Sequence, residues 1–153
     1  MDSMIRIDTA RLDDAAAIAA LSGELGYALS EEQARANLSR MLASPLQRIF
    51  VVRDEQAHAL AWLGVERRCS LESGESCEIS GLVVGSQARR RGVGRALIAA
   101  AAQWARAQGF AKLRVRSNAA RSESHRFYQS LGFAPVKTQH VYDLELGTEA
   151  REG

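Results

Sequence analysis

Residues 82–98 read LVVGSQARRRGVGRALI, and this stretch organises the rest of the chain. Three apolar residues that favour a buried strand end in a turn rich in arginine and glycine, and an alanine-rich helical run follows. Gly92 and Gly94 let the backbone approach a ligand closely or adopt a positive φ. The first N–H groups of the new helix lack intrahelical partners and favour an anion such as a phosphate.

Four arginines accompany these glycines, and guanidinium groups bind phosphate oxygens in pairs. They are Arg89, Arg90, Arg91 and Arg95. The sequence lacks the G-x-x-x-x-G-K-[ST] string of a P-loop, and Leu97 stands where a dinucleotide-binding fingerprint needs its third glycine. We interpret residues 89–95 as a pyrophosphate-binding turn of another type, and the alternative is a basic turn without a ligand.

The length and composition predict one globular domain over residues 1–153 with a single hydrophobic core. A net charge of +2 is too small to indicate a nucleic-acid partner, because the basic residues gather mainly around residues 89–95 and in the last third of the chain. No apolar run approaches the roughly 20 residues that span a bilayer, and the N-terminus lacks the pattern of a signal peptide. We therefore expect a cytoplasmic protein with no membrane partner.

Cys69 and Cys77 are the two cysteines of the chain. Their spacing fits no zinc pattern, and we expect no metal site. Neither cysteine has a nearby histidine in the sequence that would activate it as a nucleophile. We expect two free thiols, although the two residues flank a turn and a contact across a hairpin is the alternative.

Hydrophobic periodicity predicts a mixed α/β chain in which strands and helices follow the order β-α-α-β-β-β-α-β-α-β. Asp13 and Asp14 are expected in the first turn of the first helix, where they favour its dipole. Ser30 and Gln33 form a capping box for a second helix, whose buried face holds Ala34, Leu38, Met41 and Leu42. Strands are expected at residues 5–8, 49–53, 59–67, 77–84 and 112–117, with one or two more over residues 137–146. The last two helices are expected at 94–108 and 122–131.

This element order, together with four motifs, resembles the GNAT superfamily of N-acetyltransferases. Arg89-x-x-Gly92-x-Gly94 resembles the R/Q-x-x-G-x-G/A signature, and Asn118 closes the following strand. Residues 127–133, with the sequence FYQSLGF, resemble the second acetyl-CoA motif, and residues 25–27 lie where related enzymes form part of the acceptor pocket. The resemblance implies a mostly antiparallel sheet of six to seven strands, flanked by four helices and splayed between its fourth and fifth strands.

The resemblance also implies that acetyl-CoA is the co-substrate. The backbone at the end of the fourth strand is expected to pair with the pantetheine arm, and an N–H near Val84 to polarise the thioester carbonyl. Asn118 is expected to bond the pantetheine from the neighbouring strand. The implied cofactor-binding residues are Leu82, Val83, Val84, Arg89, Arg90, Arg91, Gly92, Val93, Gly94, Arg95 and Asn118.

Two catalytic residues follow from the resemblance. Tyr128 is expected to protonate the departing CoA thiolate, since a phenol with a pKa of about 10 keeps its proton at neutral pH; the alternative is a packing role. Glu78 occupies the position of the base in some protein acetyltransferases. Strand alternation puts it on the face of Ser80 and Leu82 unless a bulge intervenes, and we expect burial there to raise the pKa of its carboxyl. The alternatives are that Glu78 binds the substrate ammonium or bridges strands.

We therefore expect an enzyme that transfers an acetyl group from acetyl-CoA to a primary amine by direct attack. The acceptor is a small molecule or a peptide, and the sequence does not distinguish them. A CoA-binding sensor or interaction module without transferase activity is the alternative. A homodimer is an arrangement that the resemblance leaves open.

Overall fold

The structure is a computed structural model that describes residues 5–117 and 122–147. The chain divides into two compact units, Met1–Arg116 and Ser117–Gly153. The first unit holds the elements β1 (Arg6–Thr9), η1 (Leu12–Asp14), α1 (Ala15–Glu24), α2 (Glu31–Leu42), β2 (Gln47–Arg53), β3 (Ala59–Ser70), β4 (Gly74–Val84), η2 (Ser86–Ala88), α3 (Val93–Ala107) and β5 (Arg114–Val115). The second unit holds α4 (Ser122–Ser130).

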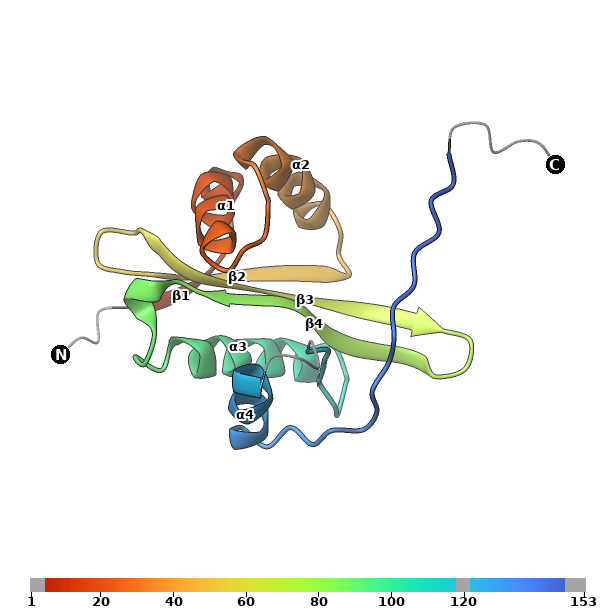
Figure 1. Cartoon of the computed structure of the whole chain (residues 1–153). Helices are drawn as coiled ribbons and strands as arrows, with labels where there is room; N and C mark the ends of the chain where they lie inside the picture. The colour runs from red at the N-terminus through yellow and green to blue at the C-terminus, as the bar shows by residue number, and fades with distance from the viewer. Residues whose placement is uncertain (1–4, 118–121, 148–153) are drawn as a thin grey trace. The chain divides into compact units, whose positions relative to one another are not determined.

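One open sheet forms the centre of the first unit, with its strands in the order β1-β2-β3-β4-β5 (Figure 1). The first four strands pair antiparallel, and β5 pairs parallel to β4 at two positions, Glu78–Arg114 and Ile79–Val115. The described residues thus form five strands in one sheet. The sheet is mixed and mostly antiparallel, which is the type of sheet that the sequence predicted. The parallel ladder ends at Ile79, five residues before β4 itself ends.

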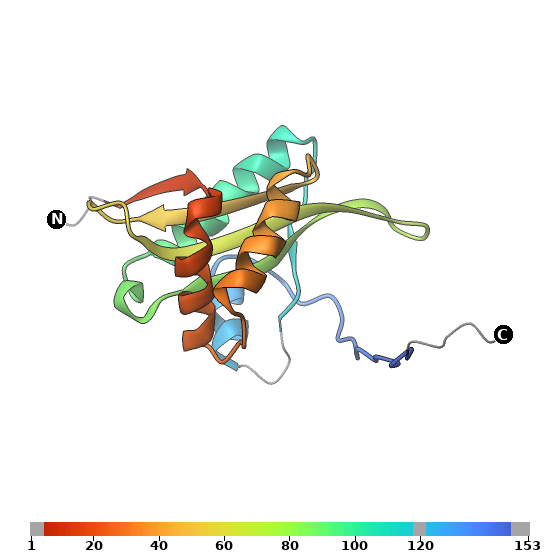
Figure 2. The ribbon, with the colours of Figure 1, turned by 90° about the horizontal axis from the view of Figure 1, so that it is seen from above.

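The helices of the first unit cover both faces of this sheet. Figures 1 and 2 show α1 and α2 side by side on one face and α3 on the other. The core under α1 and α2 includes Ile18, Leu38 and Val51. On the side of α3, Leu97 and Ala101 are fully buried. Burial on both faces explains why β2 and β3 read as nearly continuous apolar runs rather than as a strict alternation.

Local sequence signals place the helix ends. The Ser30 hydroxyl accepts from the Gln33 N–H at 3.0 Å, and the Gln33 amide oxygen accepts from the Ser30 N–H at 2.9 Å, which confirms the predicted capping box. Gly109 follows α3 with φ +94°, as expected for the residue that ends a helix. Leu42 is the exception on α2, since it is 38% exposed and its expected burial is wrong.

A β-bulge at Ser80 interrupts the pairing of β4 with β3, since the register shifts by one residue opposite Gly64. Glu78 opposes Glu66, whereas Leu82 opposes Leu63. The extra residue turns the following side chains over, so Leu82 and Glu78 lie on opposite faces. Strict alternation had put them on one face, and the bulge is the physical reason that it fails here.

Trp62 of β3 explains why residue 81 is a glycine. A Cβ at Gly81 would lie 2.7 and 2.9 Å from carbon atoms of the Trp62 ring. The indole N–H of Trp62 donates to the Ser22 hydroxyl of α1 at 3.3 Å, which holds the ring toward α1. The ring therefore occupies the space that a side chain at position 81 would fill.

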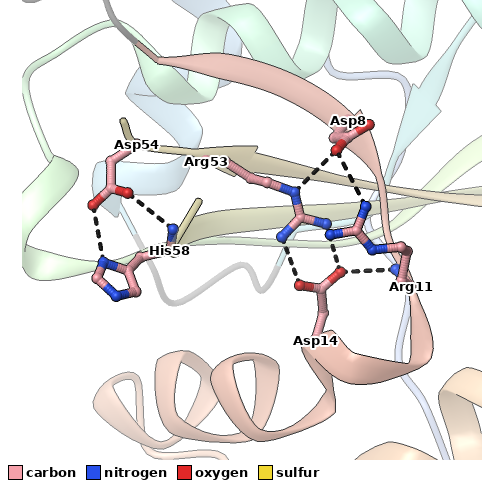
Figure 3. A network of polar contacts seen from close by, with 6 residues as sticks. All are labelled: Asp8, Arg11, Asp14, Arg53, Asp54 and His58. Atoms are coloured by element: carbon pink, nitrogen blue, oxygen red, sulfur yellow. Dashed lines mark hydrogen bonds and ion pairs between the residues drawn. The ribbon is translucent and has the colours of Figure 1, made fainter. Parts of the chain in front are cut away.

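A buried ion network ties the start of the chain to β2 (Figure 3). The Arg53 guanidinium, which is 2% exposed, donates to both carboxylate oxygens of Asp14 at 2.7 and 2.8 Å and to Asp8 at 3.0 Å. Burial alone would raise the pKa of Asp14, but the hydrogen bonds from Arg53 and from the Arg11 N–H outweigh it, and the pKa lies below its usual range. Asp14 is therefore a buried ion-pair partner, beyond the dipole role that the sequence predicted.

In the second unit, α4 ends as the sequence predicted. Gly132 adopts φ +96°, and the Phe133 N–H donates to the Tyr128 carbonyl at 3.1 Å. Residues 133–147 contain no helix or strand, so the strand expected over residues 137–146 is not found, and the six to seven strands are not confirmed. The alternating side chains of this segment stay exposed, including Val141 at 89% and Leu144 at 81%.

Candidate active site

The turn between β4 and α3 is anchored at both ends. Ala88 in η2 and Val93 at the start of α3 are each 1% exposed, so their side chains fix the turn to the core. Between them stand the exposed residues Arg89, Arg90, Arg91 and Gly92. The basic part of the turn therefore faces solvent, as do Ser86 and Gln87 of η2.

Two residues of this turn adopt the left-handed backbone conformation. Gly92 has φ +75° and ψ +13°, and Arg90 has φ +65°. Gly92 does so without strain, but a residue with a Cβ such as Arg90 pays roughly 1–2 kcal/mol. Such strained residues cluster at ligand-binding sites, where the surrounding structure holds them in place.

The start of α3 presents backbone donors. Its N-cap is Gly92, which has no side chain to accept a hydrogen bond, and the Gly92 carbonyl accepts from the Ala96 N–H at 3.0 Å. The N–H groups of Val93, Gly94 and Arg95 precede that first helical bond and have no acceptor within the helix. Together with the helix dipole, they make this end of α3 suited to an anion.

The four predicted arginines are all exposed, but they are not equivalent. The Arg89 Nε donates to the Val84 carbonyl at 3.3 Å, so this guanidinium is turned back to the end of β4. Arg90, Arg91 and Arg95 lie with Gly92 around the start of α3. The structure thus brings the predicted phosphate-binding residues together, with Arg89 bridging the turn and the strand.

The backbone of β4 next to this turn has groups that face away from β3. The Gly85 N–H donates to the Leu60 carbonyl at 3.0 Å, and alternate residues of an antiparallel strand face the same neighbour. Val83 therefore faces β3, whereas Leu82 and Val84 direct their N–H and C=O groups to the other edge. In the described part of the chain, β5 pairs with β4 only before this point, so that edge lacks a strand partner at Leu82 and Val84.

Glu78 lies earlier on β4, 4% exposed. Its Oε1 accepts from Arg116 Nε at 3.0 Å and Arg68 Nη1 at 3.1 Å, and its Oε2 accepts from Arg116 Nη2 at 3.2 Å. Burial raises the pKa of this carboxyl, but the two arginines more than offset it and the pKa lies below its usual range. The raised pKa that the sequence suggested is therefore wrong, while the catalytic role of Glu78 stays a prediction.

Sequence reasoning missed a carboxylate of α1, that of Glu24, which contacts the backbone just after β4. The Ser86 N–H donates to Glu24 Oε1 at 2.9 Å, and this bond joins the end of α1 to the turn. The two residues are 62 positions apart. No local pattern around Glu24, an exposed glutamate at a helix end, could have indicated the contact.

Tyr128 and Asn118 belong to the second unit. Tyr128 is half-buried on α4, and its ring packs edge-on against Phe127 and Phe133 at centroid distances of 5.2 and 5.6 Å. These contacts fix the ring within its own unit and agree with either role expected for it. Asn118 lies outside the described residues.

Three aromatic side chains are candidates for lining an acceptor pocket, namely Tyr27, Trp62 and Tyr142, and they differ in burial. Trp62 packs against the core between α1, α2 and the sheet. Tyr27 is 54% exposed and Tyr142 is 87% exposed. Trp62 thus serves the core, and the described residues of either unit taken alone form no distinctive acceptor site.

The described residues contain no cluster of three or more His, Cys, Asp and Glu side chains that could hold a metal ion. Within the same residues, no helix combines the length and apolar character needed to cross a membrane. Cys69 and Cys77 are free, as expected. Cys77 is 2% exposed, and burial raises the pKa of its thiol, so it is not an activated nucleophile.

Comparison with known proteins identifies relatives of this fold. The chain is 32% identical to an aminoglycoside N(6')-acetyltransferase type 1 of Serratia marcescens over 124 residues, which cover 77% of this chain and 84% of the relative. The crystal structure of the 6'-N-acetyltransferase AAC(6')-IG of Acinetobacter haemolyticus matches with a TM-score of 0.80 at 20% identity, over 93% of this chain and 99% of that one. AAC(6')-Iy in complex with CoA matches with a TM-score of 0.82 at 19% identity, over 92% and 94%.

The sequence profile of the acetyltransferase (GNAT) family matches residues 15–133. The match includes the arginine-glycine turn, the end of β4 and α4 with Tyr128. It also spans most of the chain, and the neighbours in structure share the same fold. The chain therefore belongs to the acetyltransferase (GNAT) family and is an acyltransferase.

Proposed function

We propose that this protein transfers an acetyl group from acetyl-CoA to the primary amine of a small molecule. The observation that carries the proposal is the turn at residues 85–95, where free helical N–H groups, a left-handed backbone and exposed arginines gather beside the open edge of β4. These are the groups that a pyrophosphate and an amide-rich pantetheine arm require. CoA is bound in a structural neighbour of this chain, which supports the assignment.

We propose that the acceptor amine attacks the thioester carbonyl directly. A C–N bond forms, the C–S bond breaks, and the amine loses a proton while the CoA thiolate gains one. The buried Cys77 supports this route, because a thiol with a raised pKa would form an acyl-enzyme poorly. A backbone N–H of Leu82 or Val84 would stabilise the developing oxyanion, since these two residues face the free edge.

Tyr128 is our proposed general acid for the departing thiolate. Its ring is held by Phe127 and Phe133, so the hydroxyl can be removed without removing the packing. Glu78 as the general base remains a hypothesis, and a positioning role is its competitor. Asn118 remains a proposed contact of the pantetheine arm.

For the acceptor, we propose an amino sugar of the aminoglycoside class as the first to test. The support is the relative at 32% identity, whose name states acetylation of an aminoglycoside at N(6'). A single domain over residues 1–153 is also proposed, because the family match runs across the boundary between the two units. A cytoplasmic location and a homodimer remain proposals, which fractionation and light scattering would check.

The test is release of free CoA thiol from acetyl-CoA with a panel of acceptors. The panel pairs an aminoglycoside carrying a 6'-amine with its 6'-hydroxyl counterpart, and adds a polyamine and a lysine peptide. We expect release with the 6'-amine and none with the 6'-hydroxyl. Stabilisation by CoA without thiol release from any acceptor would support the sensor alternative and overturn the transferase.

Substitution of Tyr128 by phenylalanine tests the acid. We expect kcat to fall by roughly 100-fold or more, within the range for loss of a general acid, with KM for acetyl-CoA unchanged. Tyr142→Phe is the matched control, because it removes a hydroxyl from a residue that is 87% exposed. Equal kcat values for Tyr128→Phe and the unsubstituted enzyme would remove Tyr128 from the mechanism.

A further inference from the structure

Glu78 is part of a line of alternating charges across three strands. Glu66 and Glu78 are directly opposed in the register of β3 and β4, an arrangement that is destabilising for like charges. Arg68 of β3 offsets this repulsion, with contacts of 3.7 Å to Glu66 and 3.1 Å to Glu78. Arg116, just after β5, completes the line from the other side with its two bonds to Glu78.

These contacts leave Glu78 poorly suited to accept a proton from a substrate amine. Two guanidinium groups donate three hydrogen bonds to its carboxylate, which is buried. Protonation would replace two favourable ion pairs with a neutral acid beside two positive charges. The same contacts hold the pKa of Glu78 below its usual range, far from the working range of a base for an ammonium.

The position of the Arg116 contact gives Glu78 a different use. The parallel ladder of β4 and β5 ends at Ile79 and Val115, immediately before the bulge at Ser80. A bulge increases the local twist, which accounts for the end of the ladder at this point. The two-point contact of Arg116 with Glu78 therefore fastens β5 to β4 at the place where the two strands part.

We propose that Glu78 is a positioning residue, which acts through Arg116 to hold the end of β5 against β4 and so sets where the strands part beside Leu82–Val84. This inference rests on the proposed function, since that edge of β4 is the proposed site of the pantetheine arm. Glu78 touches no reacting atom in this arrangement. Its loss moves β5 and weakens the binding of the co-substrate more than it slows the chemistry.

The experiment compares Glu78→Gln, Arg116→Gln and the double variant in steady-state kinetics and in calorimetric titration with CoA. We expect KM for acetyl-CoA and Kd for CoA to rise by about tenfold in each single variant, with kcat changed by less than about threefold. The double variant should be no worse than either single one, because both remove the same contact. The acid limb of the pH profile of kcat should lie at the same pH in these variants as in the unsubstituted enzyme.

Arg68→Gln is the matched control. It removes a guanidinium from the same carboxylate, but from β3 rather than from the end of β5. We expect Kd for CoA in this variant to stay within about twofold of that of the unsubstituted enzyme. A general electrostatic effect would instead raise Kd in Arg68→Gln as it does in Arg116→Gln. If Arg68→Gln weakens CoA as much as Arg116→Gln does, the proposal is overturned.

A general base would behave differently in two respects. Glu78→Gln would lower kcat by roughly 100-fold or more with CoA affinity intact. Arg116→Gln would move the acid limb of the profile to higher pH, as the Glu78 carboxyl lost a cation. Either result overturns the positioning role but leaves the transferase proposal standing. Should Glu78→Gln fail to fold, Arg116→Gln carries the test, because the Arg116 side chain is 46% exposed.

Discussion

Replacing Asp14 by asparagine should destabilise the fold much more than the same change at Asp13. Both residues precede α1, and an effect on the helix dipole alone would cost each about 0.3–1 kcal/mol. The structure separates them, since Asp13 is exposed whereas Asp14 is 6% exposed and carries two hydrogen bonds from Arg53. The comparison therefore tests whether the buried ion pair or the dipole dominates.

The magnitude follows from what the substitution leaves behind. Breaking a buried ion pair by removing one partner costs about 3–5 kcal/mol. Arg53 keeps its 3.0 Å contact with Asp8, which is partly exposed, and asparagine still offers one oxygen. We therefore take the lower end, about 3 kcal/mol for Asp14→Asn. For a chain of this length, that corresponds to a fall in Tm of roughly 6–12 °C.

The effect of pH has a definite sign. The pKa of Asp14 is lowered in the folded state, so its contribution to stability is complete above the pKa of an unfolded aspartate, about 3.9. That contribution is lost as the pH falls through the lower pKa of the folded state. The difference in unfolding free energy between the unsubstituted protein and Asp14→Asn should be constant from about pH 5 to 8 and shrink below about pH 4.

Urea and thermal unfolding of the unsubstituted protein, Asp14→Asn and Asp13→Asn, repeated across this pH range, measure these quantities. Asp13→Asn should lose less than about 1 kcal/mol. Equal losses at the two positions would refute the ion-pair reasoning. If the difference in unfolding free energy between the unsubstituted protein and Asp14→Asn did not shrink in acid, the assignment of the stabilising charge to Asp14 would be refuted.

Two further substitutions test the turn and the packing of Trp62 against Gly81, and a third, Gly23→Ala, is the control for the second. The new methyl group of Gly92→Ala meets no atom within 4 Å, but the residue must hold φ +75°, so the substitution should lower the unfolding free energy by about 1–2 kcal/mol. It should also weaken the binding of CoA in a calorimetric titration. Unchanged affinity for CoA would exclude the left-handed turn from the site. Gly81→Ala places a methyl group against the Trp62 ring and should cost about 1–3 kcal/mol in urea unfolding. Gly23→Ala has open space around its new methyl group in α1 and should instead stabilise the fold by about 0.5–1 kcal/mol. If Gly81→Ala and Gly23→Ala changed the unfolding free energy alike, the packing described for Trp62 would be contradicted.

Features set by neighbouring residues were predictable from the sequence. The capping box of Ser30 and Gln33 and the glycines that end α3 and α4 depend on residues a few positions apart. The arginine-glycine turn is of the same kind, because the strand, the turn and the helix are continuous in the chain. Its residues were therefore placed together correctly, although the bond from Arg89 to Val84 was not foreseen.

Features set by distant residues were not predictable in this way. Arg53 and Asp14 are 39 positions apart, and nothing local distinguishes Asp14 from Asp13. The bulge at Ser80 depends on the register with β3, which a strand does not encode by itself. The alternation over residues 137–146 predicted a strand, but a strand also needs a partner, and these residues form none in the structure.

The placement of Trp62 against Gly81 provides an optical signal from within the protein. Trp62 and Trp104 are the two tryptophans of the chain, the first on the central sheet and the second buried in α3. A ligand strand laid along Leu82 and Val84 would lie one residue from the glycine that the Trp62 indole covers. Intrinsic fluorescence of the Trp104→Phe variant, in which Trp62 is the remaining tryptophan, can thus test whether the cofactor binds along β4 without any added dye.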